Sequence, residues 1–345
     1  MHDFTSAMSS ILSRLRLFLA LFLISLLFWI VDFRTLLQAL ANIRIIYIVY
    51  LVALSFLLIW ISCFKWQLFV KASGHQTGIL SLMKYYTMSY FFNLFLPSSL
   101  GGDVARSVQL GHRLSSYESA FAATFIERIT GFLAMILMGV AFVAAGSQAT
   151  HGVEAAVLLV AFIALLGSCV CFSRRLADLF ANRLRQFANT MMAPPRAEKL
   201  VHFMDKLSAS IDFARNDLPL FAKAMVLSFV FHLCAVLNTY VCAHAVGWYE
   251  ADFGGLCVVV PLILLVSVAP VTPSSVGLQE GAFLFFLQRI GASYAEGLSI
   301  GLLITAKSVI IACVGGLLYL FCREEKKRRP ADAAQELPHP IDPLV

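Results

Sequence analysis

Long apolar runs are the feature that most constrains the fold of this chain. A transmembrane helix needs about 20 mostly apolar residues, with about 17 as the lower limit. Six runs reach that length: 15–31, 45–64, 119–146, 153–172, 219–246 and 294–322. Apolar residues make up 60% of the chain and charged residues 13%, against about 45–50% and about 25% in soluble domains. The sequence therefore predicts an all-α polytopic membrane protein with six or more transmembrane helices.

Two shorter apolar stretches, 79–96 and 253–272, each lead into the same short motif. Pro-Ser-Ser-Leu-Gly at 97–101 returns as Pro-Ser-Ser-Val-Gly at 273–277. Apolar segments interrupted by Pro and Gly at matching places in two halves of a chain point to the binding site of a transporter. Ordinary turns use the same residue types, but here the flanking apolar pattern repeats as well. We therefore interpret the motif as part of an internal repeat.

The distribution of Lys and Arg predicts the orientation. These residues collect in the connection 173–218 and in the tail 323–345, whereas the loops 147–152 and 247–252 contain neither. Cytoplasmic segments carry the excess of Lys and Arg. Both termini and the 173–218 connection are therefore predicted to be cytoplasmic, in a multi-pass protein of the bacterial cytoplasmic (inner) membrane.

The same constraint predicts an inverted-topology repeat. Segment 79–113 has to enter and leave on the cytoplasmic side, and segment 253–291 on the outer side, so both are expected to be re-entrant hairpins. Repeat one then covers about 45–146 and repeat two about 219–322, an architecture that places a site near the bilayer midplane. We expect one membrane domain, 1–322, followed by a disordered cytoplasmic tail, 323–345.

The polar residues of the hairpins suggest what such a site binds. Residues 97–113 are too polar to face lipid, and irregular backbone at membrane depth has to be buried in protein or line a water-filled cavity. Ser99 and Ser275 are predicted N-caps of short helices, whose N-termini would favour a phosphate group. Two such ends meeting from opposite faces would hold one anionic group, whereas a surface loop is the alternative for 97–113.

Ionisable residues within spans are energetically expensive and usually functional. Glu127 and Arg128 point about 100° apart on a helix, so they are predicted to pair with other residues, such as Asp103 and Arg106, rather than with each other. Lys307 lies in the middle of run 294–322. Three further polar residues of run 219–246 are assigned to interhelical hydrogen bonding: His232, Asn238 and His244.

Three ordered motifs resemble signatures of a known family. They are the segment from Asn93 to Arg106, the Glu127-Arg128 pair followed by Gly131, and the segment from Pro270 to Gly281. Together they resemble the flippase-like integral membrane family typified by the membrane half of bacterial lysylphosphatidylglycerol synthase. The resemblance covers residues 10–322 and implies movement of lipids or lipid-linked headgroups between leaflets. No aminoacyl-transferase domain follows residue 322, so it does not imply lipid synthesis.

The first hypothesis is therefore a lipid flippase whose basic residues bind a phosphate-bearing lipid. Its candidate substrate-binding residues are Asn93, Pro97, Ser98, Ser99, Gly101, Gly102, Asp103, Arg106, Glu127, Arg128, Pro273, Ser274, Ser275, Gly277, Gln279, Glu280 and Lys307. An intramembrane lipid-modifying enzyme, and a scaffold that anchors an envelope glycosyltransferase or synthase, are the alternatives. No catalytic residue is assigned.

The remaining features predict partners and cofactors. The basic amphipathic pattern of 173–218 is typical of a helix on an anionic membrane surface, and a plain cytoplasmic linker explains it equally well. All eight cysteines lie in or at the ends of apolar spans without metal-ligand spacing, which favours packing roles. No metal, cofactor or nucleic-acid partner is predicted. The expected partners are a phosphate-bearing membrane lipid and envelope-biosynthesis proteins.

Overall fold

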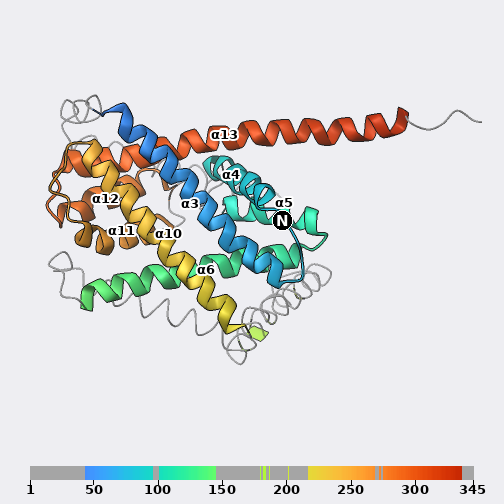
Figure 1. The fold of residues 1–345 in the computed structure, drawn as a ribbon, viewed down its shortest axis with the longest axis horizontal. Helices are drawn as coiled ribbons and strands as arrows, with labels where there is room; N and C mark the ends of the chain where they lie inside the picture. Colours follow the sequence, from blue (N-terminus) through green and yellow to red (C-terminus); the bar gives the residue numbers. More distant parts are fainter. Residues whose placement is uncertain are drawn as a thin grey trace, which may run out of the picture.

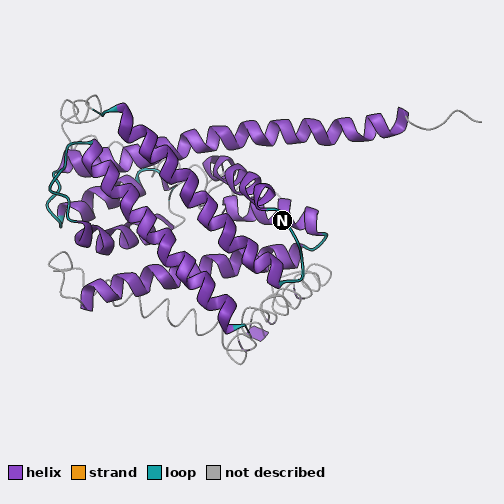
Figure 2. Cartoon of the chain, viewed as in Figure 1, coloured by secondary structure: helices purple, strands orange, loops and turns teal. Residues whose placement is uncertain are grey.

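The computed structural model of the protein describes residues 43–95, 101–144, 217–268 and 275–335, with Thr272 and isolated positions between 179 and 201. Within these residues all regular structure is helical (Figure 2), which confirms the predicted all-α fold. The predicted spans 15–31 and 153–172 lie outside the described residues, as do most of the connection 173–218 and the end of the tail.

Two groups of four helices make up the described chain, separated by the 173–218 connection. The first group is α3 (Ile45–Ala72), α4 (Ile79–Phe95), α5 (Gly101–Leu114) and α6 (Tyr117–Ala144). The second is α10 (Leu218–Ala245), α11 (Phe253–Val268), α12 (Leu278–Gln288) and α13 (Tyr294–Gln335). Among the described residues, α3, α6, α10 and α13 are the helices long and apolar enough to cross a membrane. This confirms four of the six predicted spans.

Corresponding helices of the two groups run in opposite directions. α3 and α10 pack side by side and are antiparallel, and α6 runs opposite to α13 (Figure 1). The contacts also correspond, since α13 packs on α4 of the first group and α6 packs on α11 of the second. The short helices α5 and α12 pack against their own neighbours, α5 on α4 and α6, and α12 on α11 and α13.

Local sequence explains where α10 begins and ends. The Asp217 carboxylate accepts a hydrogen bond from the backbone N–H of Leu220 at 2.9 Å, and Pro219 lies in the first turn, where its missing N–H costs nothing. Gly247, with φ 96°, follows the last turn in a conformation that only glycine adopts readily. These two signals set the ends of α10 at Leu218 and Ala245.

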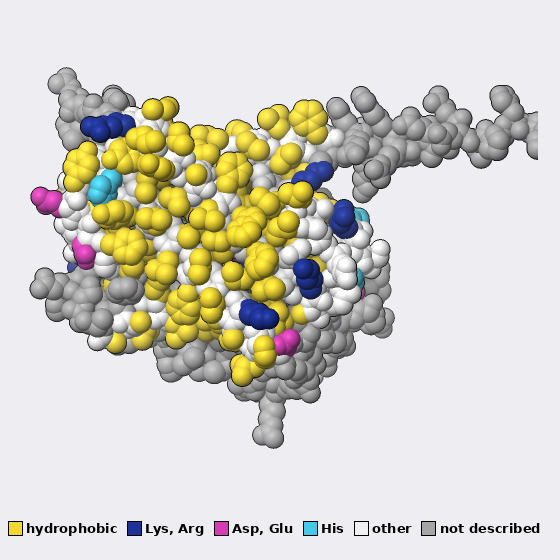
Figure 3. Space-filling model, in the orientation of Figure 1, with side chains coloured by type: hydrophobic (Ala, Val, Ile, Leu, Met, Phe, Trp, Pro, Cys, Tyr) yellow, Lys and Arg dark blue, Asp and Glu magenta, His cyan; other side chains and the backbone are white. Residues whose placement is uncertain are grey.

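The outer surface of α3 and α10 is apolar. Large side chains on both helices are exposed, among them Phe56, Trp60, Val226 and Leu233. Figure 3 shows hydrophobic side chains covering the face along which these two helices run. Because soluble proteins rarely expose an apolar surface of this extent, we expect this face to contact lipid tails.

The two groups approach most closely where α13 crosses α4. A Cβ atom at Gly315 would overlap the Thr87 carbonyl oxygen, and one at Gly316 would lie 2.7 Å from the Phe91 ring. Small residues allow membrane helices to approach with their backbones almost in contact. The Gly315-Gly316 pair therefore sets the distance between α13 and α4.

Candidate functional site

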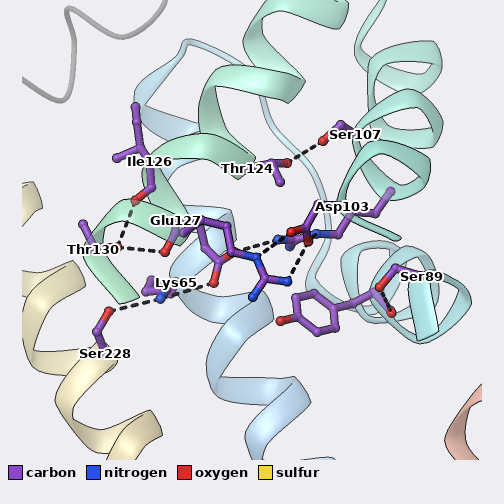
Figure 4. A network of polar contacts seen from close by, with 12 residues as sticks. Lys65, Ser89, Asp103, Ser107, Thr124, Ile126, Glu127, Thr130 and Ser228 are labelled. Carbon is purple, nitrogen blue, oxygen red and sulfur yellow. Dashed lines mark hydrogen bonds and ion pairs between the residues drawn. The ribbon is translucent and has the colours of Figure 1, made fainter. Parts of the chain in front are cut away.

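Five ionisable side chains from three helices meet inside the apolar bundle (Figure 4). We call them the charged cluster: Lys65 on α3, Asp103 and Arg106 on α5, and Glu127 and Arg128 on α6. Each cation lies within ion-pair distance of a carboxylate, and each carboxylate contacts two cations. Sequence-distant segments are therefore joined by charge rather than by apolar packing alone.

Arg106 is the fully buried centre of the charged cluster. Its Nε donates to Asp103 Oδ1 at 2.9 Å and its Nη2 donates to Glu127 Oε2 at 2.7 Å. The guanidinium carbon also lies 4.6 Å from the ring centroids of both Trp66 and Tyr86, where cation–π attraction adds to the ion pairs. With 0% of its side chain exposed, Arg106 anchors α5 to α6 and α3.

Arg128 occupies the open side of the same cluster. Its Nε donates to Asp103 Oδ2 at 2.6 Å and its Nη2 to Asp103 Oδ1 at 2.7 Å, the bidentate geometry that makes Arg–carboxylate pairs strong. Its side chain is nevertheless 39% exposed. The prediction that Glu127 and Arg128 pair with Arg106 and Asp103 is therefore confirmed.

Lys65 completes the charged cluster, and sequence reasoning missed it. Its Nζ lies 3.2 Å from Glu127 Oε1 and donates to Ser228 Oγ on α10 at 3.0 Å. The apolar run 45–64 ends one residue before Lys65, whereas α3 continues to Ala72. A helical extension of run 45–64 by one turn would have placed this lysine at membrane depth.

The charges of the cluster do not cancel. Three cations face two carboxylates, which leaves one positive charge in excess when all five groups are ionised. A charge buried in an apolar bundle needs a partner of opposite sign. Because Arg128 is the exposed cation, the excess charge is accessible at its side of the cluster.

The N-terminus of α5 is held against α4 by Asn93. The Asn93 Oδ1 accepts from the backbone N–H of Gly102 at 2.6 Å. A Cβ atom at Gly102 would lie 2.6 Å from the same oxygen, so only glycine allows this approach. Farther along, Ser107 Oγ donates to Thr124 Oγ1 at 2.8 Å and fixes α5 to α6. Asn93 thus holds the start of α5, and with it Gly102 and Asp103, against α4.

The second motif builds a smaller and less charged arrangement. Glu280 accepts from the backbone N–H of Gly277 at 2.7 Å through Oε2 and from Thr305 Oγ1 on α13 through Oε1. The predicted N-cap Ser275 is wrong, because α12 begins after Gly277. Gly277 turns the chain with φ 82°, and the Ser275 hydroxyl instead donates back to the Ser267 carbonyl of α11.

Lys307 lies apart from Glu280 and contacts α10. Its Nζ donates to Asn238 Oδ1 at 2.9 Å. On the same helix, His232 Nε2 donates to the Gly131 carbonyl of α6 at 2.9 Å. Interhelical hydrogen bonding is therefore confirmed for Asn238 and His232. It is wrong for His244, whose Nδ1 contacts the Tyr240 carbonyl of its own helix and whose ring packs on Tyr240 and Tyr249.

The remaining predicted site residues lie outside the described residues or in the first turns of the short helices. Pro97, Ser98, Ser99, Pro273 and Ser274 lie outside the described residues. Gly101 is buried at the start of α5, and Gln279 is half-buried in the first turn of α12. In the part of the chain that the structure describes, no group of three or more His, Cys, Asp or Glu side chains could hold a metal ion.

The apolar spans and the charged cluster between them define a polytopic helical membrane protein with ionisable groups at membrane depth. The chain belongs to the family described as the lysylphosphatidylglycerol synthase TM region, whose model matches residues 14–316, and the resemblance carried by the three motifs is confirmed. A curated relative is a UPF0104 membrane protein of Methanothermobacter thermautotrophicus, which is 24% identical over 280 residues, covering 73% of this chain and 78% of that protein. No solved structure matches the chain.

Proposed function

We propose that this protein is a lipid flippase that moves a phosphate-bearing lipid between membrane leaflets. The observation that carries the proposal is the excess positive charge of the charged cluster, exposed at Arg128 inside an apolar bundle. A lipid phosphate supplies the missing negative charge, while its acyl tails remain in the surrounding lipid along the apolar outer face. The description of the family, which names the membrane region of a phospholipid-producing synthase, supports a lipid substrate.

Arg128 is the residue that we propose contacts the phosphate. Its Nε and Nη2 are bonded to Asp103, which leaves Nη1 of the planar fork for a phosphate oxygen. The helix ends contribute less than the sequence suggested. The backbone N–H of Gly102 is already bonded to Asn93, and that of Gly277, next to α12, is bonded to Glu280. The basic side chains therefore carry the recognition of the substrate.

Alternating access through an inverted repeat is the proposed mechanism. The helices of the first group have 28, 17, 14 and 28 residues. Those of the second have 28, 16 and 11, followed by the 28-residue apolar part of α13. α4 and α11 are at or below the length that spans a bilayer, as expected of re-entrant hairpins. The antiparallel courses of α3 and α10, and of α6 and α13, support the repeat (Figure 1).

Single-cysteine labelling tests the repeat. Gln76 follows α3 and Glu250 follows α10, and both positions are exposed. In a cysteine-depleted protein, an impermeant reagent should label Glu250→Cys from outside and Gln76→Cys from the cytoplasm only. Labelling of both positions from the same face would contradict the inverted repeat and the cytoplasmic placement of both termini.

The flippase itself is tested by transport of a fluorescent phospholipid in reconstituted vesicles. Arg128→Gln removes the exposed cation and should reduce transport by on the order of tenfold or more, the loss expected for one charge-assisted hydrogen bond. Arg113→Gln, at the exposed end of α5, is the control and should transport normally. If Arg128→Gln transports like the control, the scaffold hypothesis replaces the flippase.

A further inference from the structure

A second group of hydrogen-bond donors lies outside the charged cluster. Lys307 Nζ donates to Asn238 Oδ1 at 2.9 Å, which uses one of the three N–H bonds of the ammonium. Asn238 is 2% exposed, and its Nδ2 has no hydrogen-bond partner among the described residues. The Lys307–Asn238 pair thus presents several hydrogen-bond donors without a described partner.

Neither half of this pair is satisfied by the protein around it. In the part of the chain that the structure describes, no carboxylate lies within ion-pair distance of Lys307. A buried amide N–H without an acceptor and a cation without an anion are both unfavourable in apolar surroundings. A group with negatively charged oxygens would satisfy both at once.

The pair is separate from the charged cluster. Both are attached to α10, the cluster through the hydrogen bond from Lys65 to Ser228 and the pair through Asn238. These two α10 residues are ten positions apart, on the order of 15 Å along a helix axis. Among the described residues, no hydrogen bond or ion pair joins Lys307 or Asn238 to a member of the charged cluster, so a headgroup that uses both sites would occupy them in turn.

We infer that Lys307 and Asn238 form a second phosphate station, at which a lipid with a singly charged phosphodiester headgroup binds after or before it contacts Arg128. This inference extends the proposed flippase function. Each station offers one positive charge in excess, and one phosphodiester negative charge balances it. A phosphomonoester or diphosphate headgroup would leave negative charge unpaired at membrane depth, which is unfavourable. The substrate class is therefore a monoanionic phospholipid.

Asn238→Asp tests the station with almost no change of shape. The new carboxylate supplies Lys307 with an anion and removes the free amide donor. Binding of phosphatidylglycerol to the purified full chain is measured by native mass spectrometry. The part of this binding that does not depend on Arg128 should weaken by on the order of tenfold. Lys307→Gln, which keeps a hydrogen bond to Asn238 but removes the charge, should show the same loss.

Matched controls lie beside both residues. The Thr239 hydroxyl donates to the Ala235 carbonyl and the Ser308 hydroxyl to the Ile304 carbonyl, each within its own helix. Thr239→Val and Ser308→Ala should therefore bind phosphatidylglycerol like the unaltered protein. Diacylglycerol, which lacks the phosphate, should not compete, and phosphatidic acid in its dianionic form should compete less well than phosphatidylglycerol.

Three results would overturn the station. The first is unchanged phosphatidylglycerol binding in both Asn238→Asp and Lys307→Gln. The second is competition by diacylglycerol equal to that by phosphatidylglycerol. The third is displacement of the bound lipid by inorganic phosphate as effectively as by lipid. The last result would assign the site to a free anion. If the two variants lose binding but the unaltered protein moves no lipid in vesicles, the station stands and the flippase fails. If transport occurs and both variants bind normally, the flippase stands and the station fails.

Discussion

The two groups of four helices have similar helix lengths, but the carboxylate on the short helix of each group has a different kind of partner. In the first half, Asp103 near the start of α5 forms an ion pair with Arg128 on α6. In the second half, Glu280 near the start of α12 accepts a neutral hydrogen bond from Thr305 on α13. Both contacts join residues 25 positions apart. The carboxylate of the short helix is thus common to both halves, and the charge of its partner differs.

Charged groups can hold helices together or can be proposed to bind the substrate, and the charged cluster combines both roles. The first half ties three helices together with buried ion pairs and exposes one cation at their edge. In the second half, Glu280 accepts a hydrogen bond from the backbone N–H of Gly277. The cation Lys307 does not contact Glu280 and donates to Asn238 on α10 instead. The structural charges and the proposed substrate-binding charge therefore belong to one cluster in the first half and lie apart in the second. Substitutions should affect stability and transport differently in each half.

The largest expected effect is on stability in the first half. Arg106→Gln removes the buried cation that both Asp103 and Glu127 contact. Because it breaks a buried pair from one side, it should destabilise the protein by about 3–5 kcal/mol. A large decrease in the Tm of the detergent-purified protein would show this. A Tm within a degree of the unaltered protein would mean that the cluster does not hold α5 in place.

A second, smaller effect is expected where the halves meet. Gly315→Ala places a methyl group against the Thr87 carbonyl, and the forced separation of α13 from α4 should cost about 1–3 kcal/mol. Gly131→Ala is the control, since its Cβ would meet only Lys65 Nζ, at 3.5 Å. Thermal unfolding of both variants should show a clear loss for Gly315→Ala alone. Equal Tm values would remove the tight crossing as a determinant of the fold.

The smallest effect is expected for the carboxylate of the second half. Glu280→Gln keeps an oxygen for the Gly277 N–H and an amide for Thr305, so it should cost only about 0.5–1.5 kcal/mol. The same change in the first half, Glu127→Gln, removes the anion shared by Lys65 and Arg106 and should cost more. Unfolding of the two variants side by side measures the difference. A larger loss for Glu280→Gln would reverse the comparison between the halves.

The sequence predicted what depends on local pattern and on helix geometry. Apolar length gave the spans of α3, α6, α10 and α13, and the angle between adjacent helix positions gave the partners of Glu127 and Arg128. The sequence did not identify Lys65 as a member of the charged cluster, because the apolar run ends one residue before it and its partner Glu127 is 62 positions away in α6. The error at Ser275 has a similar origin, since a positive φ at Gly277 moves the helix start and no composition rule shows it.

The measurement that tests the central claim most directly is phospholipid transport by the double variant Arg128→Gln/Lys307→Gln in reconstituted vesicles. These are the exposed cation of the charged cluster and the α13 cation that donates to Asn238. Arg106 and its buried ion pairs are left intact, so the variant should keep its Tm within a few degrees. Transport no faster than in protein-free vesicles is the predicted result. Transport at the rate of the unaltered protein, from a variant that is folded, would contradict a charge-based site for the lipid phosphate.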